Sequence, residues 1–157
     1  MSTDLLAKIE GAQKIWGDGL IAIGQAYVDG QDYRKLAAEL VDQCYGYDHD
    51  DGVVLFKPTR AHDHPFRQTK ESAISYFVGG NDQFAEDHGF ALQPWSAVKF
   101  VNDRVFCQSD MALCMGHYFF TSDSGISQVE YSFGYVVDST GQLRIILHHS
   151  SMPYQPA

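Results

Sequence analysis

Apolar and polar residues alternate through the C-terminal stretch Ser127–Pro153, and this alternation predicts a long antiparallel β-hairpin. The turn Asp138–Gly141 suits a type I turn followed by a bulge, with glycine in the left-handed position. In this register Asp138 pairs with Gln142, and Phe133 pairs with Leu147. The apolar face then carries Val129, Tyr131, Phe133, Tyr135, Val137, Leu143, Ile145, Leu147 and His149. The opposite face carries Glu130, Ser132, Gly134, Val136, Arg144, Ile146, His148 and Ser150.

A third strand is predicted just before this hairpin, over residues 111–121, and it ends in a similar turn, Ser122–Gly125. If Ser122 pairs with Ile126, His117 lies opposite Tyr131. We therefore expect His117, Tyr131 and His149 to form one row across three strands on the apolar face. Such a row could supply a base and a hydrogen-bond donor, or it could be a set of hydrogen-bonded core residues.

Helical periodicity precedes the strands. Apolar residues recur at steps of three and four over residues 4–29 and 32–43, and a third helix is predicted over 70–78. Residues 45–47 and 53–57 are predicted to form a short hairpin. Helices followed by a run of antiparallel strands indicate an α+β domain with the helices on one face of a curved sheet.

Length and charge narrow the function further. A chain of 157 residues indicates one domain spanning 1–157. The net charge of −9 argues against a nucleic acid or an anionic membrane surface as partner. No apolar run is long enough for a membrane helix, and the N-terminus lacks the pattern of a signal peptide. Three unpatterned cysteines indicate reduced thiols, so we expect a cytoplasmic location.

Five segments carry a resemblance to a known family: VLFKPT from Val54, Arg67, SYFVGG, VEYSFGYV and LRIILHHSSMPY. With them the chain resembles the nuclear transport factor two-like superfamily. It is most similar to the SnoaL-like group, which includes the association domain of calcium/calmodulin-dependent protein kinase II and its stand-alone bacterial relatives. The resemblance implies a cone-shaped α+β domain in which a curved, mostly antiparallel sheet packs on about three N-terminal helices. It also implies a pocket at the open end of the cone.

The superfamily typically uses a carboxylate or imidazole base in the cone, which here indicates His149 or His117 as base and Tyr131 as donor. The expected ligand-binding residues are Tyr45, Phe56, Lys57, Arg60, Arg67, Trp95 and Phe133. The three cations among them could line the mouth and attract a small anion. We expect no cofactor and no metal, because His62 and His64 have no convincing third ligand.

The function hypothesis that follows is a small-molecule-binding domain with a pocket in the cone and undemonstrated activity. A small cofactor-independent enzyme doing proton-transfer chemistry (isomerase, cyclase or hydrolase) is one alternative, and an assembly or hub module is the other. We also expect a homodimer through the sheet face that no helix covers. The residues assigned to that face are Ser132, Gly134, Val136, Ile146, Tyr118 and Phe120.

Overall fold

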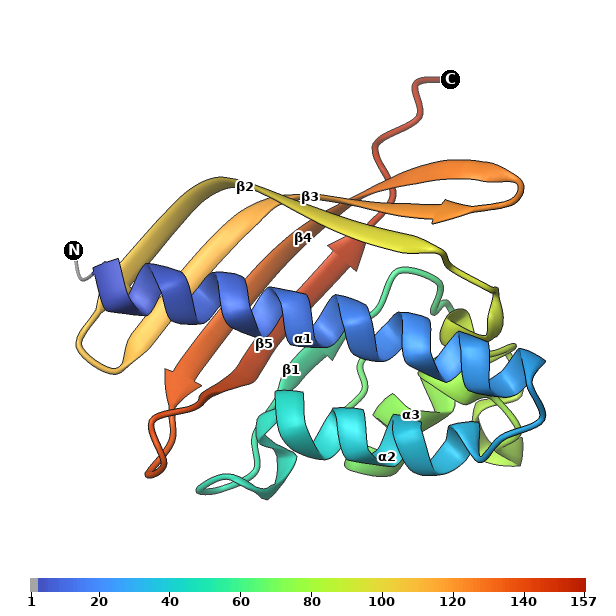
Figure 1. The fold of residues 1–157 in the computed structure, drawn as a ribbon, viewed down its shortest axis with the longest axis horizontal. Coiled ribbons are helices and arrows are strands. Elements are labelled where there is room, and N and C mark those ends of the chain that lie inside the picture. The colour runs from blue at the N-terminus through green and yellow to red at the C-terminus, as the bar shows by residue number, and fades with distance from the viewer. Residues whose placement is uncertain (1–2) are drawn as a thin grey trace.

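A long N-terminal helix crosses one face of a curved five-stranded sheet in the computed structural model, which describes residues 3–157 (Figure 1). The helices are α1 (Thr3–Val28), α2 (Tyr33–Cys44) and α3 (Lys70–Val78), with single 3₁₀ turns at Gly46–Asp48, Asp82–Phe84 and Phe90–Leu92. The strands are β1 (Leu55–Lys57), β2 (Ala97–Gln108), β3 (Met111–Ser122), β4 (Gly125–Val137) and β5 (Leu143–Ser151). The predicted α+β class, with three helices packed on a mostly antiparallel sheet, is confirmed.

The apolar side of α1 fills the concave side of the sheet. Ile9, Trp16, Leu20 and Ile23 are almost completely buried, as the helical period predicts. Gly24 allows the helix to approach the loop before β2, because a Cβ atom there would lie 2.7 Å from the carbonyl oxygen of Ala91. This close packing explains why the helix keeps a residue of low helical propensity.

The other two helices begin at hydrogen-bonded caps. The Asp32 side chain accepts a hydrogen bond from the backbone N–H of Lys35, and Thr69 and Ser72 form a reciprocal capping box at α3. These caps satisfy backbone donors that a helix N-terminus leaves free. Helix α2 packs beside α1 and α3 packs beside α2, on the same side of the sheet (Figure 1).

The strand order is β1-β5-β4-β3-β2, and only the pairing of β1 with β5 is parallel. The hairpin predicted over residues 45–57 is therefore wrong. Tyr45 makes an isolated parallel bridge to Ile145, and Leu55–Lys57 pairs with residues 147–149. Both segments use the edge of β5, whose backbone groups would otherwise lack partners.

The predicted register of β4 and β5 is correct only near the turn. Val137 pairs with Leu143 and Tyr135 with Ile145, but a bulge then shifts the pairing to Gly134 with Leu147. An extra residue in one strand moves every later side chain to the other face. Phe133 therefore lies opposite His148, which points inward, whereas the predicted inward residue His149 is exposed.

The predicted register of β3 and β4 is wrong by one residue. Ser122 pairs with Gly125, so only two residues form the loop, and His117 lies opposite Glu130 rather than Tyr131. Gly125, the first residue after this loop, has a φ of +123°, a backbone conformation that other residues rarely adopt. His117 consequently lies on the outer face with His149, while Tyr118 and Phe120 point into the core. The predicted row of His117, Tyr131 and His149 does not form, because Tyr131 alone points inward.

Candidate active site

His148 lies at the centre of the core, between the sheet and the helices. Its side chain is buried, and the rings of Phe133 and Phe56 stack on it with centroid separations of 4.1 and 4.8 Å. Phe133 comes from β4 and Phe56 from β1, the two neighbours of β5. The bulge in β5 and the parallel strand β1 together create this aromatic sandwich.

Both ring nitrogens of His148 make hydrogen bonds to phenols. Tyr45 Oη lies 2.8 Å from Nδ1, and Tyr118 Oη lies 3.1 Å from Nε2. Trp16 Nε1 donates to Tyr45 Oη at 3.1 Å. A buried imidazole with both nitrogens paired is held in one orientation.

The direction of these hydrogen bonds follows from the chemistry of the donors. An indole N–H can only donate, so Tyr45 accepts from Trp16 and gives its single hydrogen to Nδ1 of His148. The neutral imidazole then carries its hydrogen on Nε2 and donates to Tyr118. Tyr118 in turn donates to Ser150 Oγ. The donors thus all point one way, from Trp16 toward Ser150.

The chain of hydrogen bonds ends at a small cavity. Ser150 Oγ lies 2.5 Å from Thr59 Oγ1. The cavity has a volume of about 10 Å³, close to what one water molecule needs. Its polar lining comes from Thr59, Tyr76, Tyr118, His148 and Ser150, and the rest comes from Trp16, Phe56, Pro58, Phe77, Phe90 and Phe120.

Burial keeps the cluster uncharged near neutral pH. Burial, followed by the nearby His149, lowers the pKa of His148 to about 3. Burial also raises the pKa of Tyr118 well above its usual value and that of Tyr76 to about 12. The site therefore presents a neutral imidazole and neutral hydroxyl groups, which can pass protons without carrying a fixed charge.

Some of the predicted ligand-binding residues meet at this cluster. Tyr45, Phe56 and Phe133 contact His148, and Lys57 Nζ donates to the backbone oxygen of Ser150 at 3.1 Å. Tyr131 is buried too, but its hydroxyl donates to Asn102 Oδ1 at 2.6 Å.

His117 and His149 share an open depression on the outer face of the sheet. There His117 Nε2 lies 3.8 Å from Glu130 Oε2. Both imidazoles are thus separated from the inner cluster by the sheet itself.

The remaining predicted residues have other surroundings. The Arg67 guanidinium is fully buried and makes two 2.7 Å hydrogen bonds to Asp87, so its expected place at the pocket mouth is wrong. The Trp95 indole is also buried and donates to the backbone oxygen of Phe90 at 2.8 Å. Arg60 is exposed, with its guanidinium 5.1 Å from the Phe90 ring centroid.

The sequence reasoning missed Trp16, Thr59, Tyr76, Tyr118, His148 and Ser150 as site residues. A signal for three of them was present, because the alternation already assigned Tyr118, His148 and Ser150 to one common face. The error was in the strand pairing, because the inward direction predicted for Tyr131 and Phe133 is correct, but the wrong registers placed Tyr118, His148 and Ser150 on the outer face.

No group of three or more His, Cys, Asp or Glu side chains within residues 3–157 is placed to hold a metal ion. In the loop that contains His62 and His64, the Glu86 carboxylate accepts backbone N–H bonds from both histidines, at 2.6 and 2.8 Å. The loop is thus organised by Glu86. No helix in the described part of the chain is long and apolar enough to cross a membrane.

The comparisons with known proteins agree with this fold and identify the family. The family model "Metal-independent carbonic anhydrase" matches residues 7–152. A metal-independent carbonic anhydrase from Nostoc sp. is 40% identical over 153 residues, which cover 95% of this chain and 74% of that protein. A solved structure of the iota-carbonic anhydrase from a cyanobacterium, complexed with bicarbonate, superposes with a TM-score of 0.91 at 37% identity, covering 99% of this chain and 94% of that one.

A nuclear transport factor two-like protein from Pseudomonas putida matches with a TM-score of 0.57 at 19% identity, over 99% of this chain and 91% of that chain. At this identity the match shows the fold alone, and it confirms the resemblance drawn from the sequence.

The relatives overturn the function expected from the sequence. A binding domain of undemonstrated activity is wrong, because the family model and the similar proteins are carbonic anhydrases. Neither the isomerase, cyclase or hydrolase alternative nor the hub alternative is favoured. The sequence reasoning stopped at the superfamily, whose shared fold hosts many activities. The chain belongs to the metal-independent carbonic anhydrase family.

Proposed function

We propose that this protein interconverts carbon dioxide and bicarbonate without a metal ion, at the cluster around His148. The observation that carries this proposal is the neutral, buried imidazole, which is linked through Tyr118 to the hydroxyl groups of Ser150 and Thr59 at a cavity. Membership of the family and the relative's complex with bicarbonate support it.

The lining of the cavity has the chemistry that both forms of the substrate need, although the cavity as it stands has room for about one water molecule. Carbon dioxide is apolar and suits the aromatic walls, whereas bicarbonate oxygens need hydrogen-bond donors, which the hydroxyl groups supply. Tyr76 and Phe90 separate this cavity from a surface pocket of about 90 Å³, which Arg60 also lines. We place the substrate entrance there, with the Arg60 guanidinium as the cation that attracts bicarbonate. Two carboxylates also line this pocket: Glu86, which accepts backbone N–H bonds, and Asp87, which is paired with Arg67.

The hydration step needs a nucleophile and a route for one proton. A water oxygen bonds to the carbon of CO₂, one C=O π bond opens onto its oxygen, and the water loses a proton. Hydroxyl donors at Thr59 and Ser150 stabilise the charge that develops on the CO₂ oxygens. The proton passes through Ser150 and Tyr118 to Nε2 of His148, once the hydroxyl hydrogens have reversed and the imidazole carries its own hydrogen on Nδ1. In dehydration, the imidazolium formed in this way returns the proton through Tyr118 and Ser150 to the leaving hydroxyl of bicarbonate, and His148 becomes neutral again.

A rate measurement in metal-free buffer tests the proposal. We expect the purified protein to accelerate CO₂ hydration, followed by a pH indicator in a stopped-flow instrument, and to keep this activity after dialysis against a chelator. Elemental analysis of the same sample checks that zinc is absent. Activity that disappears on chelation and returns with zinc would contradict the proposal.

We propose that two copies of the chain associate through the outer face of the sheet. Tyr118 and Phe120 point inward and cannot contribute, but Phe106, Leu113 and Met115 on this face are 54%, 41% and 59% exposed. Leu113 and Leu147 cover Gly134 between them, which gives a continuous apolar surface. Light scattering should give twice the monomer mass at micromolar concentration and the monomer mass for Met115→Lys. A wild-type monomer would contradict this interface.

A further inference from the structure

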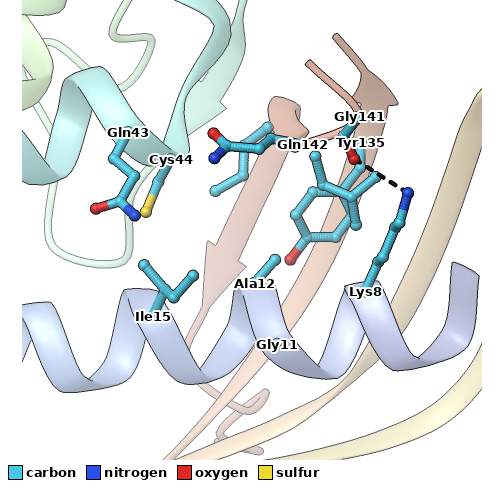
Figure 2. A pocket seen from close by; sticks show the side chains of 11 residues that line it. Lys8, Gly11, Ala12, Ile15, Gln43, Cys44, Tyr135, Gly141 and Gln142 are labelled. Atoms are coloured by element: carbon cyan, nitrogen blue, oxygen red, sulfur yellow. Dashed lines mark hydrogen bonds between the residues drawn. The ribbon is translucent and has the colours of Figure 1, made fainter. Parts of the chain in front are cut away.

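A second cavity, of about 220 Å³, lies between α1, the end of α2 and the β4–β5 turn (Figure 2). Its walls include Ile15, Leu143 and Ile145, and it shares no lining residue with the His148 cavity. An apolar protein cavity of about 150 Å³ can hold a benzene molecule. The space is thus large enough for a substituted aromatic ring.

The hydroxyl group of Tyr135 opens into this cavity without a partner. The Tyr135 side chain is 2% exposed, and its hydroxyl makes no hydrogen bond within residues 3–157. In Figure 2 the hydroxyl points toward Ala12 of α1, across the space. No fully buried side-chain oxygen within residues 3–157 lacks a partner, so the Tyr135 hydroxyl is reached from the cavity, where a polar atom of a ligand can replace water as its partner.

A cation stands at the Gly141 end of the same cavity. Lys8 Nζ donates to the Gly141 backbone oxygen at 3.1 Å, which leaves two of its N–H groups free for another acceptor (Figure 2). The lining contains no carboxylate, and Gln43 and Gln142 add only neutral amides. The chain as a whole has a net charge of −9, but the one charged side chain in this lining is the cation Lys8. The lining therefore favours an anion over a cation.

The thiol in the wall does not favour covalent chemistry. Burial raises the pKa of Cys44 to about 12, so the sulfur stays protonated and is a poor nucleophile. The features that remain are a cation at one end, apolar walls, and an unpaired hydroxyl. They match a ligand with an acid group, a compact apolar body and a second polar atom.

We propose that this cavity is a reversible binding site for small aromatic carboxylates that carry a second polar group, as para-hydroxybenzoate does. The carboxylate pairs with Lys8, the ring packs against Ile15 and Ile145, and the second polar group hydrogen-bonds to Tyr135. Neither the carbonic anhydrase activity nor the His148 cluster is needed for this binding.

Titration of the full-length protein with para-hydroxybenzoate, benzoate and para-hydroxybenzyl alcohol tests the proposal, with amide shifts in NMR as the readout. We expect para-hydroxybenzoate to bind in a saturable way and each of the other probes to bind about tenfold more weakly, since each lacks one polar contact. Lys8→Met should remove the preference for the acid over the alcohol. Tyr135→Phe, which deletes a hydroxyl without a partner, should remove the preference for para-hydroxybenzoate over benzoate and leave benzoate binding unchanged.

A filled cavity provides the control. Ala12→Leu should abolish binding, whereas Ala22→Leu, at an exposed position of the same helix, should not change it. If Ala12→Leu does not fold, the changed ligand preferences of the Lys8→Met and Tyr135→Phe variants still test the proposal. Binding that survives Ala12→Leu but is lost in Ser150→Ala would overturn the proposal, because it would place the acid in the His148 cavity. The proposal would also be overturned if the amide signals of Ile15 and Tyr135 did not shift when para-hydroxybenzoate is added.

Discussion

His148→Ala is expected to lower kcat/KM for CO₂ hydration by about 10²–10⁴-fold, the range typical of a lost proton-transfer group. Within residues 3–157 the imidazole is the only group that forms hydrogen bonds with both Tyr45 and Tyr118. Removing it leaves the Tyr45 hydroxyl hydrogen without its acceptor and Tyr118 without one donor, although Trp16 still donates to Tyr45 and Ser150 still accepts from Tyr118, and this loss should also cost about 1–3 kcal/mol of stability. Initial rates in the pH-indicator assay and a urea unfolding curve measure the two effects separately.

The neighbouring histidine is the matched control for this experiment. His149 has the same side chain one position along β5, but it is exposed on the outer face, where a truncation should leave both rate and stability nearly unchanged. Tyr118→Phe separates the two roles of the cluster, because it keeps the ring in the core and breaks the path from His148 to Ser150. If His149→Ala lost as much activity as His148→Ala, the inner cluster would not be the active site.

The fold could be predicted from the sequence because its signals are local and repeated. The burial of α1 follows from the spacing of Ile9, Trp16, Leu20 and Ile23, and the α3 boundary follows from its Thr69 cap. Each of these features is decided by residues a few positions apart. The parallel pairing of β1 with β5 is not of this kind, since it joins Phe56 to His148 across most of the chain.

The site could not be predicted because it depends on two single-residue choices in strand pairing. The first is the two-residue loop before Gly125, where the sequence is also compatible with a longer turn. The second is the bulge that displaces Ile146, which no turn residue marks. Either error moves histidines between faces, and together they moved both His117 and His149 to the wrong one. The alternation of apolar and polar residues along each strand was predicted correctly, and it placed Tyr118, His148 and Ser150 on one common face.

Arg67→Met should destabilise the protein by about 3–5 kcal/mol, because it leaves the buried Asp87 carboxylate without its cation. Both side chains are fully buried in their ion pair, at 0% exposure. Arg67 also donates to the backbone oxygens of His64 and Ser72, at 2.8 and 2.9 Å, and Asp87 also accepts from Ser75 at 2.6 Å. The pair therefore joins the 61–67 loop to α3 and to the loop that leads to Phe90. Chemical unfolding of the variant measures the loss.

The pairing can be separated from simple loss of charge by two further variants. Arg60→Met removes an exposed guanidinium from the same region and should change stability by less than about 0.5 kcal/mol. The double change Arg67→Met with Asp87→Leu removes both charges, and it should recover part of the loss because no buried ion remains unpaired. Equal destabilisation in the single and double variants would show that the lost backbone contacts of Arg67, rather than an unpaired Asp87, account for the effect. In Arg67→Met the activity of the folded fraction should persist, because Arg67 lines neither the His148 cavity nor the surface pocket proposed as its entrance.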